Sequence, residues 1–195
     1  MKAELCGSQP EPSRESGVDR RAARRHTETR MKNTVFERPD WDTYFLDIAH
    51  VVARRGNCRR RQVAALIVRE KRIISTGYNG TPRGIRNCAD GGCARCAGDS
   101  ASGQNLGDCV CAHAEENAIV QAAYHGIAVR AATLYCTISP CLLCCKMIIN
   151  AGIEEVIFEN EYHFSEQARA LLGEAGVKVR QFCRKKDERV PRETP

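Results

Sequence analysis

Three features that would assign this chain of 195 residues to a class at sight are missing from it. No apolar run is long enough to cross a bilayer, and no charged–apolar–small signal peptide stands at its start. No internal repeat recurs, which speaks against a repeat architecture. Because the length is too short for two ordinary domains, we expect one domain. Because the chain shows neither a signal peptide nor a membrane-spanning run, we expect it to be intracellular and cytoplasmic, without contact to a membrane.

Disulfides are not expected either, although cysteine is abundant, with 12 residues. A chain of this size without an export signal needs no covalent staples. Several cysteines stand in close pairs, namely Cys93 with Cys96, Cys109 with Cys111, and Cys141 with Cys144. In a reducing compartment such spacing favours thiolate–metal ligation over disulfides.

The net charge of +6 is modest, and basic residues gather near 20–25, 54–61 and 185–186. A basic surface suits phosphate-bearing ligands, whether nucleotides or nucleic acids. A solvated surface run is the commoner explanation of any single group of this kind. The charge pattern alone therefore identifies no partner.

Composition divides the chain into three parts. Residues 1–33 hold Pro, Ser, Glu and Arg without apolar periodicity, so we expect a disordered N-terminal extension. Residues 34–182 carry regular apolar patterns and form the expected folded domain. Residues 183–195 are highly charged and are expected to fray.

The first part of the domain predicts a helix followed by a hairpin. Asp40 is a suitable N-cap for the helix. Five apolar residues then recur at helical spacing and give it one apolar face: Trp41, Tyr44, Phe45, Ile48 and Val52. Strands at 62–68 and 72–76 are joined by a tight turn at Glu70 and Lys71. Residues 83–110 are rich in Gly and Cys without any period, and a metal clip would explain so long a loop.

After this loop the predicted elements alternate. Helices are expected at 113–125, 141–150 and 165–175, closed by Gly126, Gly152 and Gly176. Strands are expected at 132–137, 154–159 and 177–182. This alternation predicts an α/β fold, a three-layer α-β-α sandwich with a mixed five-stranded sheet whose first two strands form the hairpin.

Two motifs, each opening a predicted helix, carry the chemistry: His113-Ala114-Glu115 and Pro140-Cys141-Leu142-Leu143-Cys144. One imidazole and two thiolates, from His113, Cys141 and Cys144, give a tetrahedral zinc three protein ligands and leave the fourth position to water. The positive end of a helix dipole helps to keep the two cysteines as thiolates. Glu115 projects beside the metal without being forced to bind it, so it can carry protons as the catalytic acid and base.

Each motif alone has another interpretation. A Cys-x-x-Cys pair is also typical of structural zinc sites and of redox centres. Both motifs together, with a proline before the first cysteine and a strand between them, match the H-x-E…P-C-x-x-C signature of zinc-dependent nucleobase deaminases. We therefore interpret them as one catalytic zinc site.

The stretch from Trp41 to about Val179 resembles the deoxycytidylate (dCMP) deaminase family of the zinc-dependent cytidine-deaminase superfamily. The similar segments are 41–45, 72–80, 111–119, 139–141 and 146–153. The resemblance implies a cytidine-deaminase-like fold over residues 34–182 and hydrolysis of dCMP to dUMP and ammonia, which supplies thymidylate synthesis. It also implies an allosteric homo-oligomer, hexamer or dimer, that responds to dCTP and dTTP. In the family the asparagine that matches Asn79 hydrogen-bonds the sugar, and the resemblance implies the same for Asn79. The alternative is that Asn79 is an ordinary loop residue, since a short polar side chain also suits a loop.

The resemblance extends to a second, structural zinc. Cys58 and Cys88 match ligand positions of such a site in some phage dCMP deaminases. The other two ligands stay open among the loop thiols, and we expect Cys93 or Cys96 together with Cys109. Four thiolates would close a long loop that otherwise lacks a core. We therefore expect Zn²⁺ as the cofactor, with one catalytic and one structural ion.

The arginines before the first predicted strand are candidates for the substrate phosphate. A guanidinium can bind a phosphate through two parallel hydrogen bonds, and we assign this role to Arg60 and Arg61. One alternative is a deaminase that acts on tRNA or single-stranded DNA, but stacking on bases needs aromatic residues and Arg54–Arg61 has none. Another is a non-catalytic, zinc-containing nucleic-acid-binding module, which leaves Glu115 without a role. We expect no nucleic-acid partner.

Overall fold

The computed structural model describes residues 38–101, 104–162 and 166–184. The expected extension at 1–33, residues 185–195 of the expected tail and Ser165 lie outside these ranges. The chain divides into units 1–38 and 39–195, and the second contains all the helices and strands described below. Within the described ranges, no helix is both long and apolar enough to cross a membrane.

A mixed five-stranded sheet in the order β2-β1-β3-β4-β5 forms the centre of the domain. Its strands are β1 (Ala64–Arg69), β2 (Arg72–Tyr78), β3 (Thr133–Ile138), β4 (Glu155–Asn160) and β5 (Lys178–Gln181). β1 pairs antiparallel with both β2 and β3, and the β3–β4 and β4–β5 pairs are parallel. The predicted turn between β1 and β2 has positive φ at Glu70 (52°) and Lys71 (60°), the conformation of a two-residue hairpin loop.

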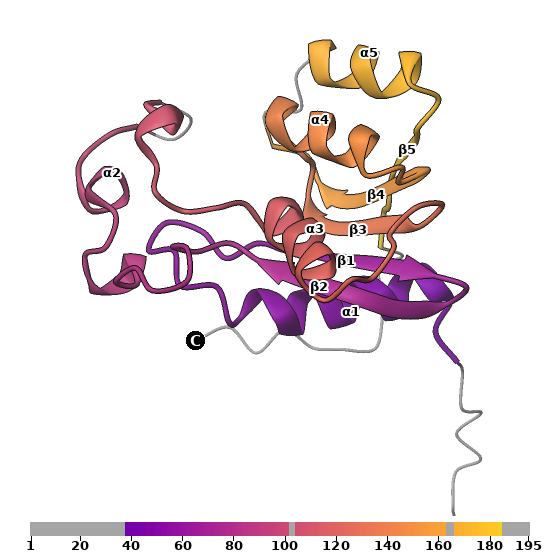
Figure 1. Ribbon diagram of the computed structural model, residues 1–195, viewed down its shortest axis with the longest axis horizontal. Coiled ribbons are helices and arrows are strands. Elements are labelled where there is room, and N and C mark those ends of the chain that lie inside the picture. The colour runs from indigo at the N-terminus through magenta and orange to yellow at the C-terminus, as the bar shows by residue number, and fades with distance from the viewer. Residues whose placement is uncertain (1–37, 102–103, 163–165, 185–195) are drawn as a thin grey trace, which may run out of the picture. The chain divides into compact units, whose positions relative to one another are not determined.

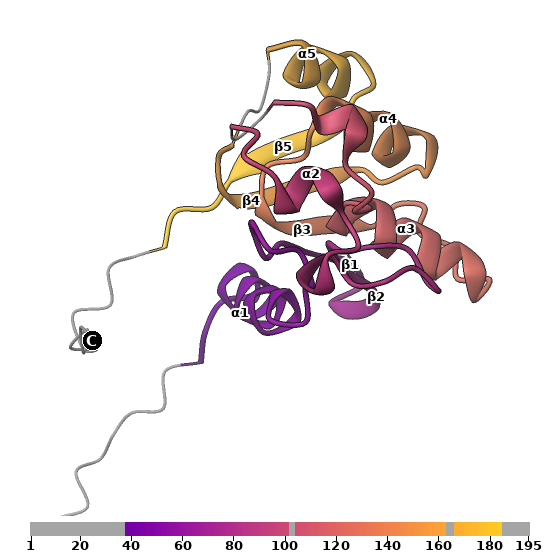
Figure 2. The same cartoon turned by 90° about the vertical axis from the view of Figure 1, so that its left-hand side faces the viewer.

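Helices cover both faces of the sheet, which confirms the predicted three-layer α-β-α sandwich (Figures 1 and 2). Helix α1 (Trp41–Ala53) packs on one face. The other face carries α3 (Ala114–Tyr124), α4 (Leu142–Asn150) and α5 (Glu166–Glu174). Alternate residues of β1 serve the two layers, since Leu66 packs under α1 while Ala65 and Ile67 face the other helices. The two cores therefore share one sheet.

Helix α1 begins at the predicted cap, because an Asp40 carboxylate oxygen accepts a hydrogen bond from the Thr43 N–H at 2.8 Å. The apolar face is only partly buried. Trp41 and Tyr44 are 40% and 44% exposed, whereas Leu46 and Ala49 are fully buried. The apolar stripe is wider than the part that reaches the sheet, and only packing selects which residues are covered.

The described residues of the segment between β2 and α3 contain only short helical pieces, as the lack of period in this segment predicted. They are the 3-10 turns η2 (Cys88–Asp90) and η3 (Leu106–Asp108) and the single turn α2 (Ala94–Ala97). The ends of this segment meet in a bridge in which Gly80 and Ala112 exchange backbone hydrogen bonds of 3.2 and 2.9 Å. The segment extends to one side of the sheet and returns directly before His113 (Figure 1).

Candidate catalytic metal site

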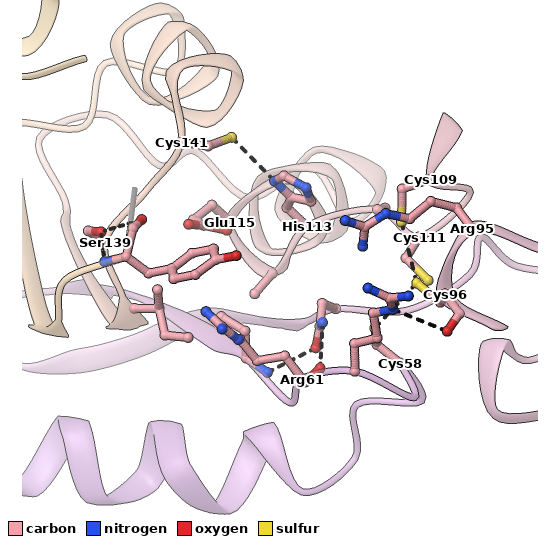
Figure 3. Close-up of a pocket in the computed structure, with 17 residues that line it drawn as sticks. Cys58, Arg61, Arg95, Cys96, Cys109, Cys111, His113, Glu115, Ser139 and Cys141 are labelled. Carbon is pink, nitrogen blue, oxygen red and sulfur yellow. Dashed lines mark hydrogen bonds between the residues drawn. The ribbon is translucent and has the colours of Figure 1, made fainter. Parts of the chain in front are cut away.

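The three predicted ligands converge at the starts of two helices. His113 is the N-cap of α3, Cys141 is the N-cap of α4, and Cys144 lies in the first turn of α4. The Nδ1 atom of His113 lies 3.3 Å from the Cys141 sulfur and 3.4 Å from the Cys144 sulfur, and Figure 3 shows His113 and Cys141 facing each other. With Zn–N of about 2.0 Å and Zn–S of about 2.3 Å, a tetrahedral zinc holds such atoms about 3.5 Å apart. The donor set and its spacing fit zinc.

The local electrostatics favour a thiolate at this point. A hydrogen bond with Cys144 and a further one with His113 outweigh the effect of burial and lower the pKa of Cys141 to about 4. The hydrogen bond with Cys141 raises the pKa of His113 to about 9. A metal ion that binds here must displace the imidazole proton, so its affinity is expected to depend on pH.

Glu115 lies in the first turn of α3 and is 5% exposed. Burial raises the pKa of its carboxyl to about 7. A carboxyl with such a pKa can both accept and release a proton near neutral pH. Its side chain lies in the pocket beside His113 (Figure 3).

The adjacent carboxylate, Glu116, has a different position and role. It accepts a hydrogen bond of 3.1 Å from the backbone N–H of His113, an otherwise unsatisfied donor at the start of α3. Two consecutive glutamates are thus divided between the pocket and the helix cap. Because of this division, Glu116 offers a matched control for Glu115.

A cavity of about 210 Å³ opens in front of these residues. Its wall includes His113, Glu115 and Cys141 together with the predicted substrate residues Asn79, Arg60 and Arg61. The wall also includes Arg95, Ser139 and Tyr162, which the sequence interpretation missed. The arginine inside Cys93-x-x-Cys96 offered a weak signal, whereas Tyr162 reaches the pocket only because it follows β4, the neighbour of β3.

Asn79 fixes the chain where it enters β1. Its side-chain carbonyl accepts a hydrogen bond from the Val63 N–H at 2.9 Å, and its amide donates one to the Arg61 carbonyl at 2.8 Å. The asparagine therefore has the structural role that suits a loop. It also lines the pocket together with Arg61. Its expected contact with a sugar remains a prediction.

The two predicted phosphate ligands differ in their contacts. The guanidinium of Arg60 donates to the carbonyl of Cys96 at 3.2 Å and also to the carbonyls of Gly98 and Ser100, so it holds the loop. The guanidinium of Arg61 stacks on the Tyr162 ring, with its central carbon 3.7 Å from the ring centroid. Stacking uses the face of the guanidinium and leaves its N–H edge to bind an anion. These contacts favour Arg61 over Arg60 as a phosphate ligand.

The expected cysteines of the loop lie close to one another, and one more joins them. The group comprises Cys58, Cys88, Cys93, Cys96 and Cys109, together with Cys111, which we had not included among the ligands. Cys111 pairs with Cys109 in the sequence and stands two residues before His113. The strand-like bridge at Ala112 turns its side chain to the loop instead.

An imidazole and two thiolates at two helix starts beside a buried carboxyl place the chain in the class of zinc-binding deaminases. Within that class, the sequence profile of the cytidine and deoxycytidylate deaminase zinc-binding region matches residues 39–160. The chain belongs to this family.

Individual relatives agree with this assignment. The deoxycytidylate deaminase of Schizosaccharomyces pombe is 46% identical over 145 residues, which cover 74% of this chain and 45% of that protein. The one of Saccharomyces cerevisiae is 47% identical over 154 residues, or 78% of this chain and 48% of that protein. The chain thus spans about half the length of these curated relatives. The crystal structure of the cyanophage S-TIM5 dCMP deaminase with dCMP and dUMP is 31% identical, has a TM-score of 0.62, and is matched over 75% of this chain and 99% of that one.

Proposed function

We propose that this protein hydrolyses dCMP to dUMP and ammonia, with Zn²⁺ held by His113, Cys141 and Cys144. The observation that carries the proposal is Glu115, a buried carboxyl with a pKa near 7 beside three convergent metal ligands. A structural zinc site or a redox pair would have no use for such a group. The relationship to deoxycytidylate deaminases supports dCMP as the substrate.

The residues of the chain divide the reaction between them. Zinc, when bound, supplies the acidity that brings the pKa of a coordinated water near neutrality. Glu115 accepts a proton from a water molecule while the oxygen of that water bonds to C4 of the cytosine ring. The carboxyl delivers this proton to the ring nitrogen N3, then takes the remaining proton from the new C4 hydroxyl and passes it to the exocyclic nitrogen. The C4–N bond breaks, ammonia leaves, and the water oxygen remains as the uracil carbonyl.

Substrate selection is proposed to rest on the opposite wall of the pocket. The N–H edge of Arg61 would bind the 5′-phosphate, and Asn79 would lie against the deoxyribose. Arg60 would act at one remove, since its three carbonyl contacts hold the loop that completes this wall. A wall fitted to deoxyribose is expected to reject a ribose 2′-hydroxyl.

We further propose an allosteric homo-oligomer, a dimer or hexamer, that responds to dCTP and dTTP as the family resemblance implies. An apolar surface on α3 and just after it supports self-association, because Val120, Tyr124 and Ile127 are 53%, 69% and 37% exposed. The described cysteines are free thiols, several of them grouped as metal ligands are, which fits a reducing compartment. We therefore place the protein in the cytoplasm. Light scattering with and without dCTP measures the assembly.

The decisive assay compares kcat/KM for dCMP, CMP, deoxycytidine and short single-stranded DNA, with and without dCTP. We expect dCMP to be the best substrate. Loss of a charge-assisted hydrogen bond costs about 1.5–3 kcal/mol, so deoxycytidine should react about tenfold more slowly or worse. Arg61→Gln should shrink this preference. Equal rates on dCMP and deoxycytidine would contradict the phosphate contact, and faster turnover of DNA would favour a nucleic-acid deaminase.

A further inference from the structure

The loop between β2 and α3 is organised around sulfur. In its described part, the buried apolar cluster consists of cysteines alone: Cys88, Cys93, Cys96 and Cys111, with Cys58 and Cys109 packed against them. An ordinary loop core of this kind would contain aliphatic or aromatic side chains, which give more apolar contact per residue. Six thiols from separate points of the chain instead share one small volume.

These thiols form two overlapping groups of four. Within each group all sulfur atoms lie within 4.8 Å of one another. The first group is Cys58, Cys88, Cys96 and Cys111, and the second is Cys93, Cys96, Cys109 and Cys111. Cys96 and Cys111 belong to both. Two tetrahedra that share one edge have this pattern of four unshared and two shared corners.

The sulfur–sulfur distances fit metal coordination. Cys58 and Cys96 are 3.8 Å apart in the first group, and in the second Cys109 lies 3.7 Å from Cys96 and 3.9 Å from Cys93. A disulfide needs about 2.05 Å. Two thiolates on one tetrahedral zinc with Zn–S bonds of about 2.3 Å are about 3.8 Å apart. The spacing is that of thiolates around a metal.

We propose that this loop holds two zinc ions in a binuclear zinc–thiolate site in which Cys96 and Cys111 bridge the metals. Cys58 and Cys88 would complete one tetrahedron, and Cys93 and Cys109 the other. The proposal extends the single structural zinc expected from the sequence, and it does not rest on the proposed deaminase function. A single ion would use four of the thiols and leave two others, already at coordination distance, without a role.

The surroundings of the thiols suit an anionic cluster. The backbone N–H of Arg59 points to the Cys88 sulfur at 3.5 Å, a contact that stabilises a thiolate. The guanidinium of Arg60 binds the carbonyl of Cys96, which brings a positive charge next to a bridging ligand. Gly92 allows the sharp turn that brings Cys88 and Cys93 together, since a Cβ there would lie 1.8 Å from the Arg86 carbonyl oxygen.

The site also borders the catalytic pocket. Cys58, Cys96, Cys109 and Cys111 all contribute to the pocket wall, as Figure 3 shows on the side of His113 away from Cys141. Cys111 is joined to His113 through Ala112 alone, and Arg60 and Arg95 are tied to the same loop. The two metals would therefore stabilise the wall of the pocket that we assign to substrate binding, without contacting the reacting atoms.

The test measures metals on the full chain after the catalytic ligands are removed by Cys141→Ala together with Cys144→Ala. Elemental analysis of this variant should give two zinc ions per chain, and one zinc ion per chain would overturn the proposal. After exchange with ¹¹³Cd, the NMR spectrum should contain two all-thiolate resonances split by mutual coupling through the bridging sulfurs. A single resonance, or two without coupling, would equally overturn it.

Two matched variants separate the tetrahedra in the same background. Cys58→Ser and Cys93→Ser each remove one unshared ligand, and each should lower the zinc content. If the loop held a single ion in one of the two groups, the variant that changes the other group would keep its full metal content. This result would refute the binuclear site. Far-UV circular dichroism checks folding. Should either variant fail to fold, the ¹¹³Cd spectrum of the Cys141→Ala, Cys144→Ala chain decides the question.

Discussion

The two cysteine groups of this protein lie side by side but are supported in opposite ways. The proposed catalytic ligands His113, Cys141 and Cys144 are attached to α3 and α4, which pack on the sheet through a large apolar core. In the described part of the loop the thiols have no such support, because the buried cluster there consists of the cysteines themselves. The sheet and helices position the proposed catalytic ligands, whereas we infer that the loop depends on its bound metals for order.

This difference teaches that similar Cys-x-x-Cys spacing can have opposite consequences for folding. At Cys141 and Cys144 the helix start would present two cysteine sulfurs to the proposed metal from a scaffold that is already folded. At Cys93 and Cys96 the same spacing spans a single helical turn with four residues. So short a turn is not stable alone, and we infer that metal binding and loop folding are one process there.

The largest expected effects distinguish the two groups directly. Cys88→Ala in the loop and His113→Ala at the catalytic site should each abolish deamination. Only Cys88→Ala should expose the segment 83–110 to limited proteolysis, because structural zinc–thiolate sites contribute about 10 kcal/mol or more to local folding. Digestion followed by mass spectrometry locates the cuts. Equal protection of this segment in both variants would show that the loop does not need its thiols.

Glu115→Gln should lower kcat by about 10²–10⁴-fold or more, because an amide cannot carry the protons. Zinc content and loop protection should stay at wild-type values, since Glu115 is not a proposed ligand. The matched control is Glu116→Gln, which keeps an acceptor for the His113 N–H and loses only the charge at the start of α3. It should reduce stability by less than about 1 kcal/mol with little loss of kcat. If Glu115→Gln instead lost its catalytic zinc, the assignment of roles would be wrong.

Gly77→Ala tests the packed scaffold that supports the catalytic ligands. A Cβ at this position would lie 2.1 Å from the Ala114 carbonyl oxygen and 2.3 Å from the Ala118 nitrogen, both backbone atoms of α3. Overpacking of this kind costs about 1–3 kcal/mol, and it should also shift Glu115 and lower activity. Gly107→Ala in the loop is the control, because a Cβ there meets no atom within 4 Å. Thermal unfolding of both variants measures the contrast, and similar melting temperatures would contradict it.

The smallest effect is expected at Glu159, which is remote from both cysteine groups. Burial acts to raise the pKa of this carboxyl, but hydrogen bonds from Arg184 and His50 hold it below its usual value. A lowered folded-state pKa stabilises the protein above the unfolded value of about 4.3 and loses this contribution as the pH falls through the folded pKa.

Glu159→Gln should therefore reduce stability by less than about 1 kcal/mol at pH 7, and the difference should vanish in acid. Denaturant unfolding at several pH values measures it. The control is Glu161→Gln, whose partner Arg169 lies in an ion pair with both side chains nearly half exposed, so no measurable change is expected. A deficit of Glu159→Gln that persisted in acid would exclude its charge as the cause.

The sequence by itself determined the local features of this protein. The strands and the longer helices lie within about two residues of their predicted ends, as expected for patterns set by neighbouring residues. The predicted closing residues Gly126, Gly152 and Gly176 have φ of 67°, 72° and 74°, which glycine adopts without strain. The side chains of His113, Cys141 and Cys144 also lie together, and both motifs open helices that pack on the same face of the sheet. Their role as zinc ligands stays a prediction.

Only the tertiary structure decided which distant residues meet. Contacts across the chain set the strand order and the exposure of Trp41. They also set the different partners of Arg60, which binds loop carbonyls, and Arg61, which stacks on Tyr162. The same holds for Cys111, which was not among the expected zinc ligands and lies in the thiol group of the loop. Capping, turns and periodicity act over a few residues, whereas strand pairing and side-chain packing join segments far apart in the chain. The outcome of pairing and packing can therefore not be predicted from any one local segment.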